Sequence, residues 1–134
     1  MKKFSLLIIV AFTSVTMIAQ KQAKIKFKTK TVDYGEIEYD SNGVRSFEFT
    51  NTGNAPLVIT RVNSSCGCTI PKKPEKPIQP GETGVIEVKY DTKRPGPIRK
   101  TITVESNAEQ STVALKIKGL VKAKDTKSVL EKTN

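Results

Sequence analysis

The stretch PGETGVIEVKY, residues 80–90, decides the fold class. Pro80 and Gly81 match the two central positions of a type II turn, because proline presets the first dihedral angle and glycine accepts a positive one. After the turn, the apolar side chains of Ile86 and Val88 alternate with polar ones. Alternation with a period of two predicts a β-strand with one buried face and one solvent-facing face.

The same alternation recurs outward from this strand in both directions. Segments with apolar residues at every second position cover residues 24–30, 44–50, 98–104 and 113–117. Turn signals separate them at Asp40–Gly43, Asn51–Asn54, Pro95–Gly96 and Ser106–Asn107. Helical spacing is almost absent, and short antiparallel strands leave no room for parallel crossover connections. The sequence therefore predicts an all-β, antiparallel β-sandwich of about seven or eight strands.

Three segments depart from simple alternation. Gly35 interrupts the extended run 31–39, which indicates a bulge or a crossing between sheets. Residues 56–62 carry apolar side chains on both faces, as expected for a strand with protein on each side or near a covered edge. Prolines recur every third residue over 71–80, and because they lack an amide hydrogen we expect an extended connection or a sheet edge there.

The N-terminus has the order of a secretory signal peptide. Lys2 and Lys3 precede an apolar run over residues 4–15, and Ala19 offers a small residue for cleavage. We expect residues 1–19 to be removed, with an uncleaved anchor as the alternative. The domain would then cover residues 20–121. No later segment approaches the ~20 apolar residues of a membrane span.

Export would place the mature protein in the periplasm or outside the cell. Its charged C-terminal tail, residues 122–134, has little apolar surface to bury and is expected to be frayed or disordered, with a short helix as the alternative. The whole chain has 23 basic and 13 acidic residues. Loss of two lysines with the leader leaves 21 basic residues and a net charge of about +8.

This charge favours anionic envelope polymers or lipid headgroups as contacts. Nucleic acid is not expected as a partner, because the protein is exported and only 6% of its residues are aromatic. The chain has no histidine, which excludes serine–histidine and cysteine–histidine catalysis and most transition-metal sites. Glu36 with Glu38, or Asp33 with either of them, could form a carboxylate pair, but alternate positions on an exposed strand are more often plain surface. We expect no enzyme activity, no cofactor and no metal.

Several short motifs together resemble one known family. In chain order they are Asp33–Ile37, Phe49–Gly53, Pro56–Ile59, Ser65–Thr69, Pro80–Glu82, Ser106–Asn107 and Gly119. They resemble domain-of-unknown-function family 1573, an immunoglobulin-like module of secreted Bacteroidetes proteins, over residues 31–121. The resemblance implies an immunoglobulin-like sandwich and export. It implies no catalytic residues, because the family has none established.

The most specific motif is Ser65-Cys66-Gly67-Cys68-Thr69, which contains both cysteines of the chain. A disulfide between them would require a sharp bend at Gly67, and closing three residues stabilises a fold by at most ~1.6 kcal/mol. Such a bond would suit thiol–disulfide exchange better than stabilisation. Cu(I) binding, linkage to another chain, and simple packing at a loop where the backbone needs glycine remain alternatives.

A second candidate surface is the lysine row Lys24, Lys26, Lys28 and Lys30 of the first predicted strand. It could contact an anionic polymer, although edge lysines more often prevent unwanted strand pairing. The leading hypothesis is a non-enzymatic, exported module that binds a protein or a cell-envelope component. The alternative is thiol–disulfide exchange or Cu(I) handling through Cys66 and Cys68.

Overall fold

The computed structural model describes residues 20–125. The predicted signal peptide lies outside these residues, as does most of the predicted tail, so both remain predictions. The described chain forms eight strands: β1 (Ile25–Phe27), β2 (Thr31–Ile37), β3 (Val44–Asn51), β4 (Ile59–Ser64), β5 (Thr69–Lys72), β6 (Thr83–Tyr90), β7 (Gly96–Ser106) and β8 (Thr112–Val121). None of residues 20–125 belongs to a helix with the length and apolar character of a membrane span.

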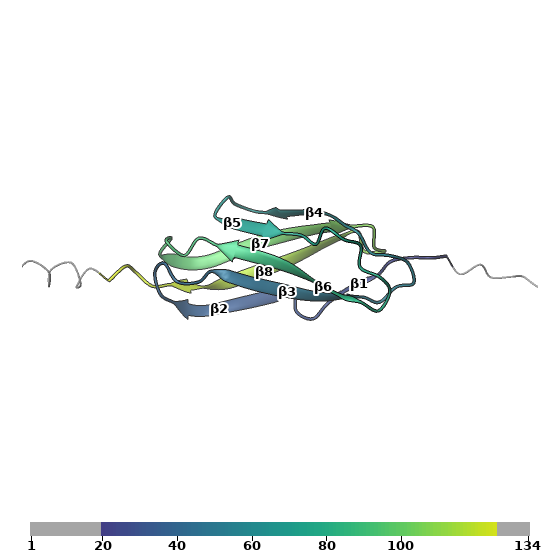
Figure 1. Cartoon of the computed structure of the whole chain (residues 1–134). Helices are drawn as coiled ribbons and strands as arrows, with labels where there is room; N and C mark the ends of the chain where they lie inside the picture. Colours follow the sequence, from purple (N-terminus) through teal and green to yellow (C-terminus); the bar gives the residue numbers. More distant parts are fainter. Residues whose placement is uncertain (1–19, 126–134) are drawn as a thin grey trace, which may run out of the picture.

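The strands form two sheets of four that pack face to face (Figure 1). The first sheet has the order β1-β3-β6-β5, and the second has the order β2-β8-β7-β4. Strand β1 therefore belongs to one sheet and its successor β2 to the other. The predicted all-β sandwich of seven or eight strands is confirmed.

One strand pair contradicts the expectation of purely antiparallel pairing. Strand β2 runs parallel to β8, with Thr31 opposite Lys116 and Val32 opposite Ile117. Parallel pairing was excluded because a crossover needs a long connection. That reasoning was wrong here, because β2 and β8 are the first and last strands of their sheet in the sequence. The whole intervening chain serves as their connection.

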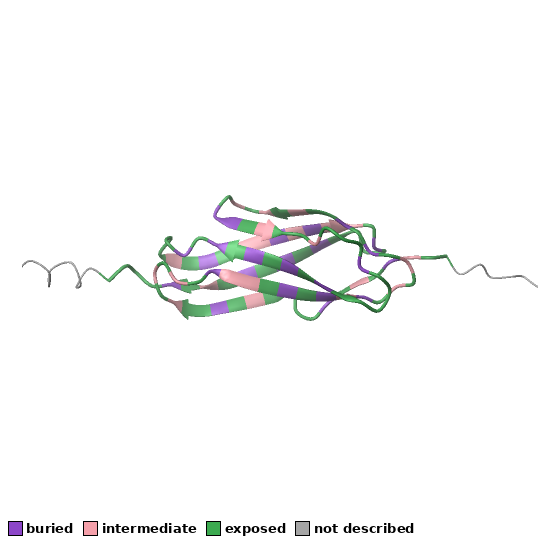
Figure 2. Ribbon diagram, viewed as in Figure 1, coloured by how far each residue is buried: buried purple, intermediate pink, exposed green. Residues whose placement is uncertain are grey.

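The apolar residues of both sheets meet in one buried layer. In β6, buried and exposed residues alternate without a break, so that Ile86 and Val88 are fully buried. Phe47 and Phe49 of β3 are buried beside them, as predicted, and the second sheet contributes residues such as Leu115. Figure 2 shows the resulting alternation of buried and exposed positions along the strands. This layer leaves polar side chains on the two outer surfaces.

Two predicted backbone features are confirmed at glycines. Gly35 has a φ of 65° and lies where the β2–β8 register shifts, so the expected bulge is present. Gly81 has a φ of 83°, and the amide of Glu82 donates to the carbonyl of Gln79 at 2.9 Å. These values describe the type II turn predicted from Pro80 and Gly81.

The first strand is shorter than predicted. Only Ile25–Phe27 pairs with β3, and Thr29 is exposed rather than buried. The chain leaves the first sheet at residues 28–30 to enter the second, so the alternation of 24–30 does not continue as one strand. The Thr29 hydroxyl instead donates to the carbonyl of Thr31 at 2.8 Å.

Strand β4 also begins later than predicted. Leu57 forms an isolated bridge with Ile78, and the regular strand starts at Ile59. A register shift between Ile59 and Arg61 lets Ile59 and Val62 both turn towards the core, although they are an odd number of residues apart. This irregularity explains why apolar residues fall on both faces of the sequence pattern. The proline segment forms edge strand β5 and an extended connection, as expected.

The beginning of the tail contacts the end of β2. The Lys122 amide donates to the carbonyl of Ile37 at 2.8 Å, and the Lys122 Nζ lies 2.8 Å from Glu38 Oε1. The Lys124 Nζ lies 5.7 Å from the centre of the Tyr39 ring. Residues 126–134 lie outside the described part, so the prediction of a disordered tail is untested there.

Tyr34 ties β2 to the other sheet. Its buried hydroxyl donates to the carbonyl of Gly43 at 2.7 Å, and its ring meets Tyr90 edge-on at 6.2 Å between centres. The Arg45 guanidinium lies 4.4 Å from the centre of the same ring. Burial raises the pKa of Tyr34 above its ordinary value of 10.0, although the nearby Arg45 charge acts in the opposite direction.

We predict that the free energy of unfolding falls as the pH rises above about 10. The raised pKa keeps Tyr34 protonated in the folded state after unfolded tyrosine has begun to ionise, so its stabilisation is complete below that pH and is lost above it. Tyr34→Phe should reduce this dependence and cost about 1 kcal/mol at neutral pH, because the Gly43 carbonyl loses one of its two donors and keeps only the Tyr90 amide. Urea titrations at several pH values measure both effects. If the free energy of unfolding of Tyr34→Phe falls just as steeply above pH 10, other groups cause the dependence.

Candidate functional site

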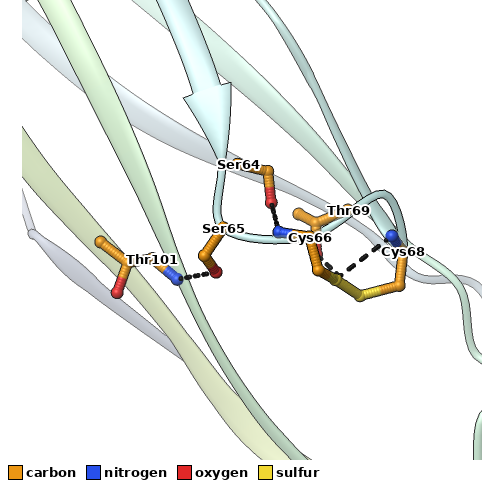
Figure 3. The surroundings of a disulfide bond; sticks show 6 residues. All are labelled: Ser64, Ser65, Cys66, Cys68, Thr69 and Thr101. Carbon is orange, nitrogen blue, oxygen red and sulfur yellow. Dashed lines mark hydrogen bonds between the residues drawn. A yellow bond between two sulfur atoms is a disulfide. The ribbon is translucent and has the colours of Figure 1, made fainter.

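The cysteine motif lies in the loop that carries the chain from the second sheet to the first. Ser64 ends β4, and Thr69 begins β5. Between them Cys66 and Cys68 form a disulfide, with their Cα atoms 5.4 Å apart (Figure 3). This arrangement is the local disulfide among the alternatives left open by the sequence.

Hydrogen bonds hold this loop against β7. The Ser65 amide donates to the carbonyl of Thr101 at 2.9 Å, and the Thr101 amide donates to Ser65 Oγ at 3.2 Å. The Cys66 amide donates to Ser64 Oγ at 3.3 Å, and the Thr69 amide closes a turn on the carbonyl of Cys66 at 3.4 Å. The loop is therefore a fixed extension of the sheet.

Gly67 lies at the turn, but the backbone at this position does not require a glycine, contrary to the prediction. Its φ is outside the left-handed region that favours glycine, and a Cβ at this position would have no atom within 4 Å. A larger residue would fit the loop itself. The effect of glycine here is to leave the exposed side of the disulfide without a side chain.

The two cysteines differ in their exposure. Cys68 is buried, whereas Cys66 is half-buried and packs against the edge of the core. Thr69 is also buried, and its Oγ1 lies 3.8 Å from Cys68 Sγ. Cys66 is therefore the sulfur that is more open to another molecule. Within residues 20–125, no three histidine, cysteine or acidic side chains group as metal ligands would.

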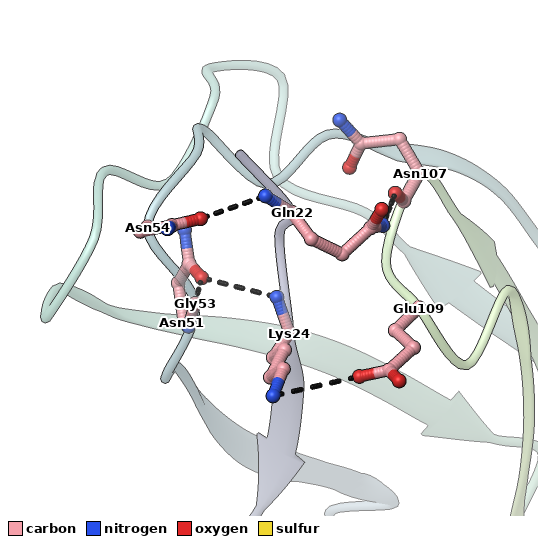
Figure 4. Close-up of polar contacts among 7 residues, drawn as sticks. All are labelled: Gln22, Lys24, Asn51, Gly53, Asn54, Asn107 and Glu109. Carbon is pink, nitrogen blue, oxygen red and sulfur yellow. Dashed lines mark hydrogen bonds and ion pairs between the residues drawn. The ribbon is translucent and has the colours of Figure 1, made fainter. Parts of the chain in front are cut away.

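The predicted lysine row does not form one surface. Lys24 Nζ lies 3.6 Å from Glu109 Oε2, so part of its charge is balanced. Figure 4 marks this ion pair. Lys26 and Lys28 line a shallow groove that they share with Glu48. Lys30 lies in the connection to the second sheet, where its carbonyl accepts the amide of Lys116 at 2.8 Å. Because β1 is an edge strand, this placement fits protection of the edge better than docking.

The acidic residues considered as a carboxylate pair are engaged separately. Asp33 Oδ2 lies 3.9 Å from Lys118 Nζ, and Glu38 contacts Lys122. Glu38 also lies beyond the end of β2 at Ile37, so the strand does not align it with Glu36. Their arrangement offers no paired acid and base for hydrolysis.

A buried amide at one end of the sandwich was missed by the sequence analysis. Asn51 was interpreted as a turn residue, yet it is completely buried. Its Nδ2 donates to the carbonyls of Ala55 and Ile78 at 2.8 and 2.9 Å. Its Oδ1 accepts the Gly53 amide at 3.0 Å; Figure 4 shows Asn51 beside Gly53. Every polar atom of the side chain is satisfied, so Asn51 has a structural role.

Two surface features also escaped the sequence analysis. One is a basic groove on the outer face of the second sheet, lined by Arg99, Lys116 and Lys118 among others. The positions of Lys116 and Lys118 on one face of a strand could have indicated this groove. The addition of Arg99 from β7 depends on strand pairing. The other feature is the free edge of β4, which depends on the order of the strands.

Comparison with solved structures supports the fold. A protein of unknown function from Porphyromonas gingivalis W83 has a TM-score of 0.66 and 18% identity, with coverage of 78% of this chain and 50% of that one. PapD-like domain 7 of human CEP192 has a TM-score of 0.63 and 10% identity, with coverage of 82% and 92%. The VesB protease of Vibrio cholerae has a TM-score of 0.56 and 13% identity, with coverage of 76% and 32%.

These likenesses show the fold alone. This chain spans half the length of the Porphyromonas protein and about a third of the protease. The comparison with curated proteins gave no match. The predicted immunoglobulin-like class is confirmed by the two sheets and by the PapD-like domain among the similar structures. The family described as "Protein of unknown function (DUF1573)" matches residues 25–121, and the chain belongs to that family.

Proposed function

We propose that this domain is a non-enzymatic module of the periplasm or cell exterior that binds a protein or an envelope component. The observation that carries the proposal is the free edge of β4, which offers unpaired backbone groups to an added strand. In Figure 1, β4 lies at the border of the fold beside β5. The surface grooves described above are shallow and bring together no catalytic set of side chains.

The register identifies the free groups of β4. The Ser65 amide donates to Thr101, and Ser64 lies opposite Ile102. In an antiparallel ladder this pattern makes Ser64 and Ile102 a non-hydrogen-bonded pair, so the amide and carbonyl of Ser64 point away from β7. The same alternation directs the backbone groups of Val62 towards the free edge.

Two other edge strands, β5 and β1, are less suited to strand addition. On β5, the pattern set by the Asp91 amide and the Cys68 carbonyl directs Thr69 and Pro71 outward. Thr69 already donates to Cys66, and Pro71 has no amide hydrogen. Edge strand β1 is three residues long and is flanked by lysines. These features favour β4 over β5 and β1 as the attachment edge.

We predict that Ser64→Pro abolishes retention of a protein partner while Ser64→Ala preserves it. Proline removes the amide hydrogen that faces the free edge and, like alanine, the hydroxyl that accepts the Cys66 amide, while the ladder to β7 stays complete. Alanine removes the hydroxyl bond to Cys66 but keeps the amide. Pull-down from an envelope extract with both variants and the native domain measures retention, and circular dichroism checks the fold. Equal retention by both folded variants would reject the β4 edge.

Thiol–disulfide exchange is a second candidate, favoured by the exposure of Cys66 beside the open side of Gly67. A thiolate of a partner dithiol would attack Cys66 Sγ, and Cys68 would leave as a thiolate beside the Thr69 hydroxyl. The partner's second thiolate would then displace Cys66 and complete its own disulfide. Two electrons pass from the partner to this domain. Cu(I) handling would require the same reduced pair.

For this second candidate we predict that the native protein equilibrates with glutathione buffers without unfolding. Reduction should lower the free energy of unfolding by at most ~1.6 kcal/mol, because the bond closes only three residues. Alkylation followed by intact mass measures the thiol state, and urea titration measures stability. A Cys66→Ser/Cys68→Ser variant is the control. It has no thiol to alkylate, and glutathione should not change its stability. A bond that resists glutathione, or whose reduction unfolds the domain, would exclude exchange.

A further inference from the structure

A groove of about 430 Å³ crosses the outer face of the second sheet, away from the free edge of β4. It spans the three neighbouring strands β2, β8 and β7. Three basic side chains and two threonines line it: Thr31, Arg99, Thr101, Lys116 and Lys118. Lys100 and Ile117 are paired with each other and point to the inner face, so they contribute only backbone. None of its lining residues is acidic.

Strand register explains why these charges converge. Lys116 lies between Thr31 and Thr101, and Lys118 lies between Asp33 and Arg99. Directly opposite side chains on neighbouring strands have Cβ atoms about 4.5–5.5 Å apart, and like charges in such a pair repel. The Lys118–Arg99 pair is therefore unfavourable for folding. A ligand that supplies negative charge would relieve this repulsion.

Little of this charge is balanced within the described residues. Asp33 lies 3.9 Å from Lys118, and both side chains are more than half exposed, so the pair is weak. Arg99 and Lys116 have no carboxylate within 4 Å in residues 20–125. The groove thus presents a local excess of positive charge that does not depend on the lysine row of β1.

We propose that this groove, defined by Arg99, Lys116 and Lys118, binds an acidic polysaccharide. Three strands at about 4.8 Å spacing extend over roughly 10 Å, which suits repeated charges on a polymer better than a single small anion. The ammonium groups are point charges without the fixed fork of a guanidinium, so they tolerate varied carboxylate or sulfate positions. The hydroxyls of Thr31 and Thr101 are suited to bonds with sugar hydroxyls.

Other polyanions match the groove less well. Its lining contains no aromatic side chain on which nucleic acid bases could stack. A membrane surface favours exposed apolar anchors around basic groups, whereas Ile117 is buried and Leu120 is the one large apolar side chain exposed on this face of β8. A carbohydrate polymer with regularly spaced charges fits these observations.

The test compares two variants that lose the same number of charges. Arg99→Gln/Lys116→Gln/Lys118→Gln removes three charges from the groove, and Lys72→Gln/Lys73→Gln/Lys76→Gln removes three from the segment after Pro71. Polygalacturonate is the probe, with neutral dextran, phosphatidylglycerol vesicles and single-stranded DNA as comparisons. We expect the groove variant to bind polygalacturonate at least about tenfold more weakly, with a shallower salt dependence. The control variant should stay within about twofold of the native protein.

Every result decides the question. Equal losses in the two variants would show that net charge alone attracts the polymer, and binding of vesicles or DNA as tightly as polygalacturonate would contradict a polysaccharide site. If the triple variant does not fold, Lys116→Gln alone should weaken polygalacturonate binding. Lys116→Arg, which keeps the charge, should bind as the native protein does. Absence of either effect would overturn the proposal. Ser64→Pro should leave polygalacturonate binding unchanged, so this test is independent of partner binding at β4.

Discussion

Burial of a single apolar face by each sheet is the constraint on which the rest of the structure depends. A β-strand directs successive side chains to opposite sides, so the residues that fill the layer around Phe47, Ile86 and Leu115 leave their neighbours outside. The outer faces, the edges and the connecting loops are then the surfaces available for recognition. The cysteine loop, the β4 edge and the basic groove each belong to one of these three kinds of surface. The residues proposed to act in binding are therefore those that the core does not bury.

Local patterns predicted most of the fold, because the signals were contained in short segments. The alternation in β6 and the turn at Pro80 and Gly81 needed no information from distant residues. The parallel pairing of β2 with β8 was missed because it joins residues near opposite ends of the domain. The early end of the first strand was missed for a related reason, since the chain changes sheets where the alternation continues in the sequence.

The candidate site divides in the same way. Cys66 and Cys68 were found because they are close in sequence, and the disulfide between them is a local event. The role assigned to Gly67 was wrong, because a bend can form without a left-handed residue. Arg99, Lys116 and Lys118 were missed as a group, because strand pairing alone brings them together. Asn51 was missed as a buried residue, because asparagine is as typical of an exposed turn as it is of a buried cluster of hydrogen bonds.

Amide hydrogen exchange tests most directly the claim that a closed core leaves an open edge at β4. We expect slow exchange throughout the central strands β3, β6, β7 and β8, whose amides are paired on both sides. Along β4 the rates should alternate, with fast exchange at Val62 and Ser64 and slow exchange at Ser65, whose amide donates to Thr101. Protection of Ser64 equal to that of Ser65 would mean that the edge is covered. Fast exchange throughout β6 and β7 would contradict the sandwich itself.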